Sequence, residues 1–178
     1  PMTFPMGEGQ IPFYYNYKMP SRMMAKSPKL INDIPVRAYQ FSIGETSYWL
    51  EYGNKPLYPF GYGLTYTTFE YGAVQLSDTI LSISGKPQSI IASCEITNTG
   101  HCDAVAIPQL YIRDVVGTLT RPLRELKGFQ RVNIPAGETR TVSFEISEQD
   151  LAYWHLAEGV TLGSDGEYAF SAEKGDFH

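Results

Sequence analysis

The chain has 178 residues, of which 43% are hydrophobic and 19% charged, and its formal net charge is −5. This length suits one ordinary domain with an appendage, and the composition is typical of a folded protein, not a disordered one. The negative charge and the lack of a basic face argue against a nucleic-acid partner, whereas a carbohydrate or a neutral protein surface fits.

No apolar run approaches the roughly 18 residues that span a bilayer, so we expect no membrane partner. Residues 1–10 have neither the basic start nor the apolar stretch of a signal peptide. The chain opens on Pro1 without an initiator Met, and we therefore expect it to be a fragment of a longer protein.

The first 53 residues show neither the helical nor the strand period. Prolines at positions 1, 5, 12, 20, 28 and 35 recur too often for a helix to propagate. The stretch IPFYYNYKMPSRMM, residues 11–24, is apolar and aromatic, whereas free linkers are polar. We therefore expect an extended, proline- and aromatic-rich arm that packs against another surface.

The arm continues into NKPLYPFGYGLTYTTFEY, Asn54 to Tyr71, where two prolines and two glycines lie among six aromatic residues. Loops seldom carry so much apolar surface. Two interpretations remain open: the aromatic side chains form a seam with another body, or they complete the core of the domain that follows.

From Phe69 onward the pattern becomes that of short strands. Alternating or apolar stretches cover residues 68–77, 88–100, 104–114, 124–135 and 138–147, and turns separate them. Within them, two sets of alternating residues predict core-facing sides: Ile90, Ala92, Cys94 and Ile96, and then Val142, Phe144 and Ile146.

The end of the chain predicts one helical turn and two more strands. Ser147 is a candidate helix cap, because acidic residues follow it in the first turn. Residues 166–172 and 175–178 have the pattern of strands. Six or seven short strands without alternating helices predict an all-β fold, an antiparallel β-sandwich of the immunoglobulin or fibronectin type III kind.

The sequence shows no pattern of a catalytic or metal site. The histidines at 101, 155 and 178 do not have the spacing of metal ligands, and no G-x-S-x-G motif marks a nucleophile. Cys94 and Cys102 form either a disulfide across the bend between them or two free thiols. We therefore assign no catalytic, cofactor-binding or metal-binding residue, and no cofactor.

The charged residues from 113 to 127 have two readings. This stretch holds the basic residues Arg113, Arg121, Arg124 and Lys127 together with Asp114 and Glu125. The mixture predicts a solvated face with cross-strand ion pairs, and contact with a partner is the alternative.

Several motifs together resemble a known family. PLYPFGYGLTYTTFEY, ITNTG, PQLYIRD, RPLRELKGFQRVNIPAGETRTVSFEISEQDLAYW and EKGDF occur in an order and spacing similar to those of the C-terminal region of glycoside hydrolase family 3, the β-glucosidase and β-xylosidase family. The opening PMTFPMGEGQIPFYYNYKMPSR is similar to the end of the second catalytic domain of that family and its connector.

The resemblance implies two parts. Residues 1–68 are the end of the α/β-sandwich domain and the connector arm, and residues 69–178 are a fibronectin type III-like β-sandwich. The family's catalytic aspartate and acid/base lie in domains that would precede Pro1, so no catalytic residue is carried over. Family sequences continue for several residues beyond the GDF position, so we expect a short or missing closing strand and an unpaired sheet edge.

This reading predicts a non-catalytic accessory domain that braces the parent's catalytic domains and borders the substrate cleft, and whose exposed seam favours a homodimer. The expected seam or cleft residues are Tyr48, Trp49, Tyr52, Tyr58, Phe60 and Tyr62. One alternative is a carbohydrate-binding module in which Trp49, Tyr58 or Trp154 stacks on a β-linked oligosaccharide, and a flat row of exposed aromatics would favour it. Another alternative is a hydrolase with an unrecognised site.

Overall fold

The computed structural model describes residues 2–18, 23–24, 29–39, 46–47, 49–83, 88–157 and 168–178. It divides into two compact units, unit 1 (Pro1–Gly63) and unit 2 (Leu64–His178). Each unit is described by itself below. None of the described helices is long and apolar enough to cross a membrane.

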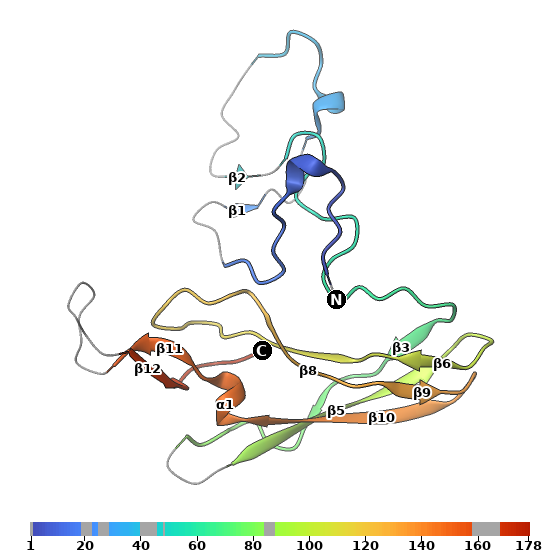
Figure 1. The fold of residues 1–178 in the computed structure, drawn as a ribbon, viewed down its shortest axis with the longest axis vertical. Helices are drawn as coiled ribbons and strands as arrows, with labels where there is room; N and C mark the ends of the chain where they lie inside the picture. The colour runs from blue at the N-terminus through green and yellow to red at the C-terminus, as the bar shows by residue number, and fades with distance from the viewer. Residues whose placement is uncertain are drawn as a thin grey trace. The chain divides into compact units, whose positions relative to one another are not determined.

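Unit 2 is built almost entirely of antiparallel strands (Figure 1). Its described elements are β3 (Phe69–Tyr71), β4 (Gln75–Leu76), β5 (Ser89–Asn98), β6 (Ala104–Ala106), β7 (Gln109–Ile112), β8 (Glu125–Phe129), β9 (Val132–Ile134), β10 (Thr139–Ser147), α1 (Glu148–Leu151), β11 (Tyr153–Leu156) and β12 (Tyr168–Ser171).

The long strand β5 organises one layer of the sandwich. β10 pairs with it along its length, from Ser89 opposite Ser147 to Thr97 opposite Thr139, and β3 and β4 also pair with it. The other strands form the antiparallel pairs β6–β9, β7–β8 and β11–β12. This arrangement confirms the expected all-β sandwich.

The main core lies between the β5 layer and the β6–β9 pair. Ile96 and Val142 of the β5 layer pack with Ala106 of β6 and Ile134 of β9, and each of the four is almost fully buried. Both predicted core faces are therefore correct, and half-buried Cys94 packs against this core. The thiols of Cys94 and Cys102 are free.

Proline divides a stretch that the alternation alone would join. Residues 104–114 form β6 and β7, with Pro108 between them. Proline has no N–H to donate to a ladder, which favours the break. The Pro108 carbonyl still accepts a hydrogen bond from Gln130 N at 3.1 Å, and this bond links the two strand pairs.

A smaller core lies at the other end of unit 2. Ile112, Leu151 and Ala172 are buried together, and the short helix α1 supplies Leu151. The predicted turn at Ser147 is therefore correct, but soon after it Tyr153–Leu156 form the strand β11, which the sequence pattern did not indicate.

The last residues pair with the segment after β7. Arg113 N donates to the His178 carbonyl at 2.7 Å, and Val115 N donates to the Asp176 carbonyl at 3.0 Å. The closing segment is short, since its pairing is an isolated bridge between Asp114 and Phe177, but at this position the edge is paired, contrary to the expectation.

One buried asparagine ties several segments of unit 2 together. The side-chain oxygen of Asn98 accepts hydrogen bonds from Thr67 Oγ1 (2.7 Å) and Gly100 N (3.1 Å). Its Nδ2 donates to the carbonyls of Cys102 and Ile134, both at 2.9 Å. Asn98 has no solvent exposure, so these four bonds replace those that water would supply.

Unit 1 has little regular structure in its described residues. They contain the 3-10 turns η1 (Glu8–Gln10) and η2 (Ile31–Asp33), and β1 (Met23–Met24) pairs in parallel with β2 (Thr46–Ser47). An antiparallel bridge joins Phe4 to Tyr58. The predicted extended arm remains a prediction.

Candidate functional sites

Most of the expected seam residues pack against other side chains of unit 1. Trp49 stacks on Phe13, with ring centroids 5.5 Å apart. Phe60 stacks on Tyr15 at 4.0 Å with an interplanar angle of 16°. Tyr48 lies outside the described residues. The aromatic character of this segment therefore serves pairwise packing inside the unit, at about 0.5–1.5 kcal/mol per pair beyond area burial.

The remaining expected residues behave similarly. Tyr58 and Tyr62 are brought together, with ring centroids 5.1 Å apart, and Tyr58 also meets Phe4 edge-on at 6.2 Å. Tyr52 covers Gly7 so closely that a side chain there would clash with the tyrosine ring. Tyr58 and Tyr62 are thus the two expected residues whose rings contact each other in the described part of the chain.

Unit 1 nevertheless exposes many apolar side chains. The exposed set comprises Met2, Phe4, Met6, Ile11, Tyr14, Ile31, Ile34, Val36, Tyr39, Leu50, Leu57 and Tyr62. Among the described residues of this unit no apolar side chain is fully buried, and the buried polar residue is Gln10. Gln10 accepts from Met6 N at 2.7 Å and donates to the Lys55 carbonyl at 3.2 Å. The described residues of unit 1 are therefore held together by the hydrogen bonds of Gln10 and by aromatic ring pairs.

Unit 2 contains a polar cluster that the sequence analysis missed, here called the Glu173 cluster: Thr118, Tyr153, His155, Ser171 and Glu173. Tyr153 Oη donates to Glu173 Oε2 at 2.6 Å, and Thr118 Oγ1 donates to the same carboxylate at 2.7 Å. His155 Nε2 lies 2.8 Å from Ser171 Oγ, and its Nδ1 lies 3.4 Å from Glu173 Oε1.

The cluster shifts the acid–base behaviour of two of its members. Burial raises the pKa of the Tyr153 hydroxyl, and the neighbouring Glu173 carboxylate raises it further. Burial alone would raise the pKa of Glu173, but hydrogen bonds from Tyr153 and Thr118 outweigh it and hold this pKa below its usual value. The cluster therefore favours a charged Glu173 and a neutral Tyr153.

His155 lies between the Ser171 hydroxyl and the Glu173 carboxylate, as the histidine of a serine hydrolase triad does, but the surroundings of these residues favour a structural role. The nearest partner of His155 Nδ1 is the Leu156 carbonyl at 2.8 Å, not the carboxylate. The histidine side chain is only 12% exposed. Ser171 ends a regular strand instead of occupying the sharp strand-to-helix turn that presents a hydrolase nucleophile.

No short motif could have revealed this cluster. His155 and Ser171 are sixteen positions apart, and only the pairing of β11 with β12, which sets His155 opposite Ala169, brings them together. The sequence offers only the stretch YWHL before a glycine-containing segment, and four residues are too short a pattern to indicate a strand pair.

The charges between residues 113 and 127 do not form a simple solvated face. Arg121 is 10% exposed, lies 3.9 Å over the Tyr153 ring and donates to Glu125 Oε1 at 2.9 Å. Lys127 Nζ lies 2.9 Å from the other oxygen of Glu125. The solvated-face expectation is therefore wrong for Arg121, which packs beside the Glu173 cluster as a cation over an aromatic ring.

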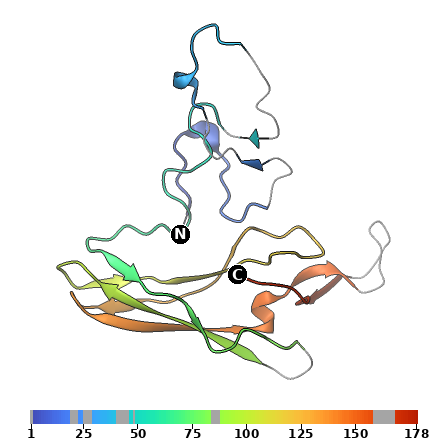
Figure 2. The ribbon, with the colours of Figure 1, turned by 180° about the vertical axis from the view of Figure 1, so that it is seen from behind.

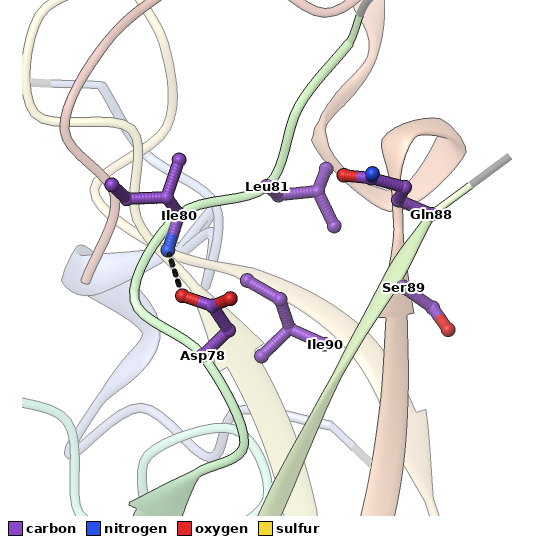
Figure 3. Close-up of a pocket in the computed structure, with 6 residues that line it drawn as sticks. All are labelled: Asp78, Ile80, Leu81, Gln88, Ser89 and Ile90. Carbon is purple, nitrogen blue, oxygen red and sulfur yellow. Dashed lines mark hydrogen bonds between the residues drawn. The ribbon is translucent and has the colours of Figure 1, made fainter. Parts of the chain in front are cut away.

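A pocket of about 320 Å³ opens between the start of β5 and the segment before it (Figure 3). It is lined by Asp78, Ile80, Leu81, Gln88, Ser89 and Ile90. The Asp78 carboxylate accepts from Thr79 N at 2.6 Å and Ile80 N at 3.0 Å, so it stabilises its own turn. Figure 3 shows this carboxylate beside two isoleucines, with no second acid or histidine among the lining residues.

The described residues also contain no group of three or more His, Cys, Asp or Glu side chains placed to hold a metal ion.

Comparison with known proteins identifies the family. Residues 106–175 match the fibronectin type III-like domain. The chain is 38% identical over 155 residues to the periplasmic β-glucosidase of Salmonella typhimurium, an alignment that covers 87% of this chain and 18% of that protein. It is 35% identical over 150 residues to a β-xylosidase of Formosa agariphila, covering 84% of this chain and 18% of the relative.

This chain corresponds to the C-terminal, fibronectin type III-like region of family 3 glycoside hydrolases. A solved β-glucosidase of Listeria innocua in complex with isofagomine agrees, with 28% identity and a TM-score of 0.67 over 99% of this chain and 23% of that one. The family 3 region described here thus spans about a fifth of these relatives.

Proposed function

We propose that this chain is a non-catalytic accessory region of a β-glucosidase-like enzyme, and that it braces the catalytic domains of that enzyme. The observation that carries the proposal is the apolar exposure of unit 1 without a fully buried apolar side chain among its described residues. Covering these exposed apolar side chains with another surface would remove them from water and stabilise the assembly. The relatives, which are about five times longer, supply candidates for that surface.

The energetic scale suits permanent docking. Completing the burial of one half-exposed aromatic side chain contributes about 2–3 kcal/mol at 25 cal/mol per Å². Several such side chains in unit 1 would together exceed the cost of holding one domain against another within a chain.

A chimaera tests the bracing role. In the Salmonella β-glucosidase, the segment aligned with this chain is either deleted or replaced by this chain. We expect the replacement to retain β-glucosidase activity and thermal stability and the deletion to lose both. In the chimaera, Leu57→Glu should lower the unfolding temperature, whereas Leu76→Glu, which changes a similarly exposed leucine of β4 in unit 2, should not. A deletion as stable as the intact enzyme would contradict bracing.

The isolated chain tests the non-catalytic part of the proposal. We expect no hydrolysis of nitrophenyl β-glucoside or nitrophenyl β-xyloside above the buffer rate. Turnover that follows the chain through purification would instead support the hydrolase alternative, with Ser171→Ala as the first variant to examine.

We also propose that the unit 1 aromatics border the substrate cleft of the parent enzyme. Tyr62 is the most exposed of the expected residues described here, at 58%. In the chimaera, Tyr62→Ala should raise KM with kcat unchanged if its ring contacts substrate and transition state equally. Unchanged kinetics would remove Tyr62 from the cleft.

A further inference from the structure

The β11–β12 hairpin places its polar contacts on one face and aromatic side chains on the other. Side chains alternate between the two faces of a strand, so Tyr153 and His155 share the face held by the Glu173 cluster. The opposite face carries Trp154, Leu156, Tyr168 and Phe170.

Three aromatic rings on this outer face are open to solvent. Trp154 is 64% exposed, Tyr168 62% and Phe170 53%. Trp154 and Phe170 lie directly opposite each other in the strand register, with ring centroids 5.4 Å apart. Tyr168 lies two residues before Phe170, on the same side of its strand. Within unit 2, both ribbon views place the hairpin at the end far from β6 and β9 (Figures 1 and 2).

The inner face fixes the hairpin that carries these rings. Tyr153 Oη donates a hydrogen bond to Glu173 Oε2 at 2.6 Å, and His155 Nε2 is hydrogen-bonded across the hairpin to Ser171 Oγ at 2.8 Å. Arg121 covers the Tyr153 ring from the neighbouring segment. Binding residues held on strands by such supporting contacts are positioned more accurately than residues on loops.

We propose that this outer face binds an uncharged, pyranose-based oligosaccharide by ring stacking, with Trp154 as its centre. None of its four side chains carries a charge, which matches a neutral glycan, and the net charge of −5 disfavours polyanionic ones. Aromatic faces accept the apolar C–H faces of a pyranose, and the Tyr168 hydroxyl adds a hydrogen-bonding group beside them.

The composition of this face distinguishes it from the exposed surface of unit 1. Three of its four side chains are aromatic, whereas most of the exposed unit 1 side chains are aliphatic or Met. A protein surface fits the mixed unit 1 set, and flat sugar rings fit the hairpin. The proposal goes beyond the bracing role and does not depend on it.

Fluorescence tests the proposal directly, because the chain has only two tryptophans. In a Trp49→Phe background, Trp154 is the sole tryptophan reporter. Titration with cellohexaose and with xylohexaose should shift its emission with at least one of them. In the same background, Phe170→Ala should weaken this binding about tenfold, equivalent to 1.4 kcal/mol.

Affinity electrophoresis in soluble β-glucan or xylan supplies a second readout with matched variants. We expect retardation of the chain to be lost in Trp154→Ala and kept in Phe129→Ala, which removes a similarly exposed aromatic from β8. Circular dichroism confirms that both variants remain folded.

Three outcomes would overturn the proposal. One is that neither hexasaccharide shifts the Trp154 emission up to its solubility limit. Another is equal weakening by Trp154→Ala and Phe129→Ala. The third is a concentration-dependent dimer that Trp154→Ala abolishes, which would assign this face to a second copy of the chain. Failure here leaves the chimaera result untouched, so the two proposals can fail separately.

Discussion

At the scale of single residues, Asn98 has the largest expected effect on the stability of unit 2. Removing its side chain by Asn98→Ala would leave the Thr67 hydroxyl, the Gly100 amide and the carbonyls of Cys102 and Ile134 without this partner. An unsatisfied buried polar group costs about 1–3 kcal/mol. Relaxation of the structure around the four groups reduces their combined cost. We expect the free energy of unfolding to fall by about 3 kcal/mol.

Urea denaturation measures this change. Thr97→Ala is the control: Thr97 lies on β5 next to Asn98, and the variant removes only its exposed hydroxyl contact to Thr139 of β10, which should cost less than about 1 kcal/mol. If Asn98→Ala lowers the free energy of unfolding no more than the control does, the stability of unit 2 does not depend on the Asn98 side chain.

The Glu173 carboxylate leads to a pH prediction. Its pKa is lower in the folded chain than its usual value of 4.5, so the unfolded chain binds its proton first as pH falls. The stabilisation is therefore fully present above about pH 4.5 and is lost as pH falls through the folded pKa.

Thermal unfolding of wild type and Glu173→Gln tests this sign. Between pH 7 and pH 3 the difference in unfolding temperature should shrink, because the variant has no carboxylate to protonate. A difference that stays constant or grows toward pH 3 would show that protonation of Glu173 is not linked to folding.

At the scale of elements, the short helix α1 depends on its N-terminal contacts. Asp150 Oδ2 accepts hydrogen bonds from both Ser147 N and Ser147 Oγ at 2.8 Å. Because α1 supplies Leu151 to the smaller core, we expect Asp150→Ala to destabilise the chain by about 1 kcal/mol. Asp150→Asn keeps an acceptor and should cost less. Chemical denaturation of the two variants compares them, and equal costs would assign the effect to charge alone.

The elements also show what the sequence could predict. Alternation correctly gave the core faces of β5 and β10, because burial of Ile96 and Val142 in a sandwich requires a period of two. It could not separate β11 from the turn before it, since four residues carry too short a pattern and their partner β12 is distant in sequence.

The candidate sites were less predictable for the same reason. The Glu173 cluster and the exposed aromatic face are two sides of one hairpin, and both follow from the register that sets Trp154 opposite Phe170. The sequence alone indicates Trp154 as a candidate sugar contact, but its two aromatic neighbours depend on long-range pairing. In unit 1 the sequence indicated aromatic packing without indicating which rings would meet.

At the scale of the whole molecule, the two units should differ in local stability. The fully buried apolar side chains among the described residues all belong to unit 2, and slow hydrogen exchange requires structure that opens only with difficulty. We expect amides of β5 and β10 to exchange far more slowly than those of residues 2–18. Mass spectrometry of exchanged peptides measures this, and equal protection in both units would show that unit 1 is stable without a covering surface.

The same asymmetry predicts self-association of the isolated chain through unit 1. Val36 and Tyr39 are almost completely exposed, and Leu57 is half exposed. A second copy can bury these side chains when no catalytic domain is available, which is the physical basis of the homodimer prediction. Sedimentation velocity should show a mass that rises with concentration, and the double variant Val36→Ser with Tyr39→Ser should remain monomeric over the same range. The matched control, Val116→Ser in unit 2, changes a similarly exposed valine and should still associate. If only the Val116 variant becomes monomeric, association occurs through unit 2, and the apolar surface of unit 1 does not drive it.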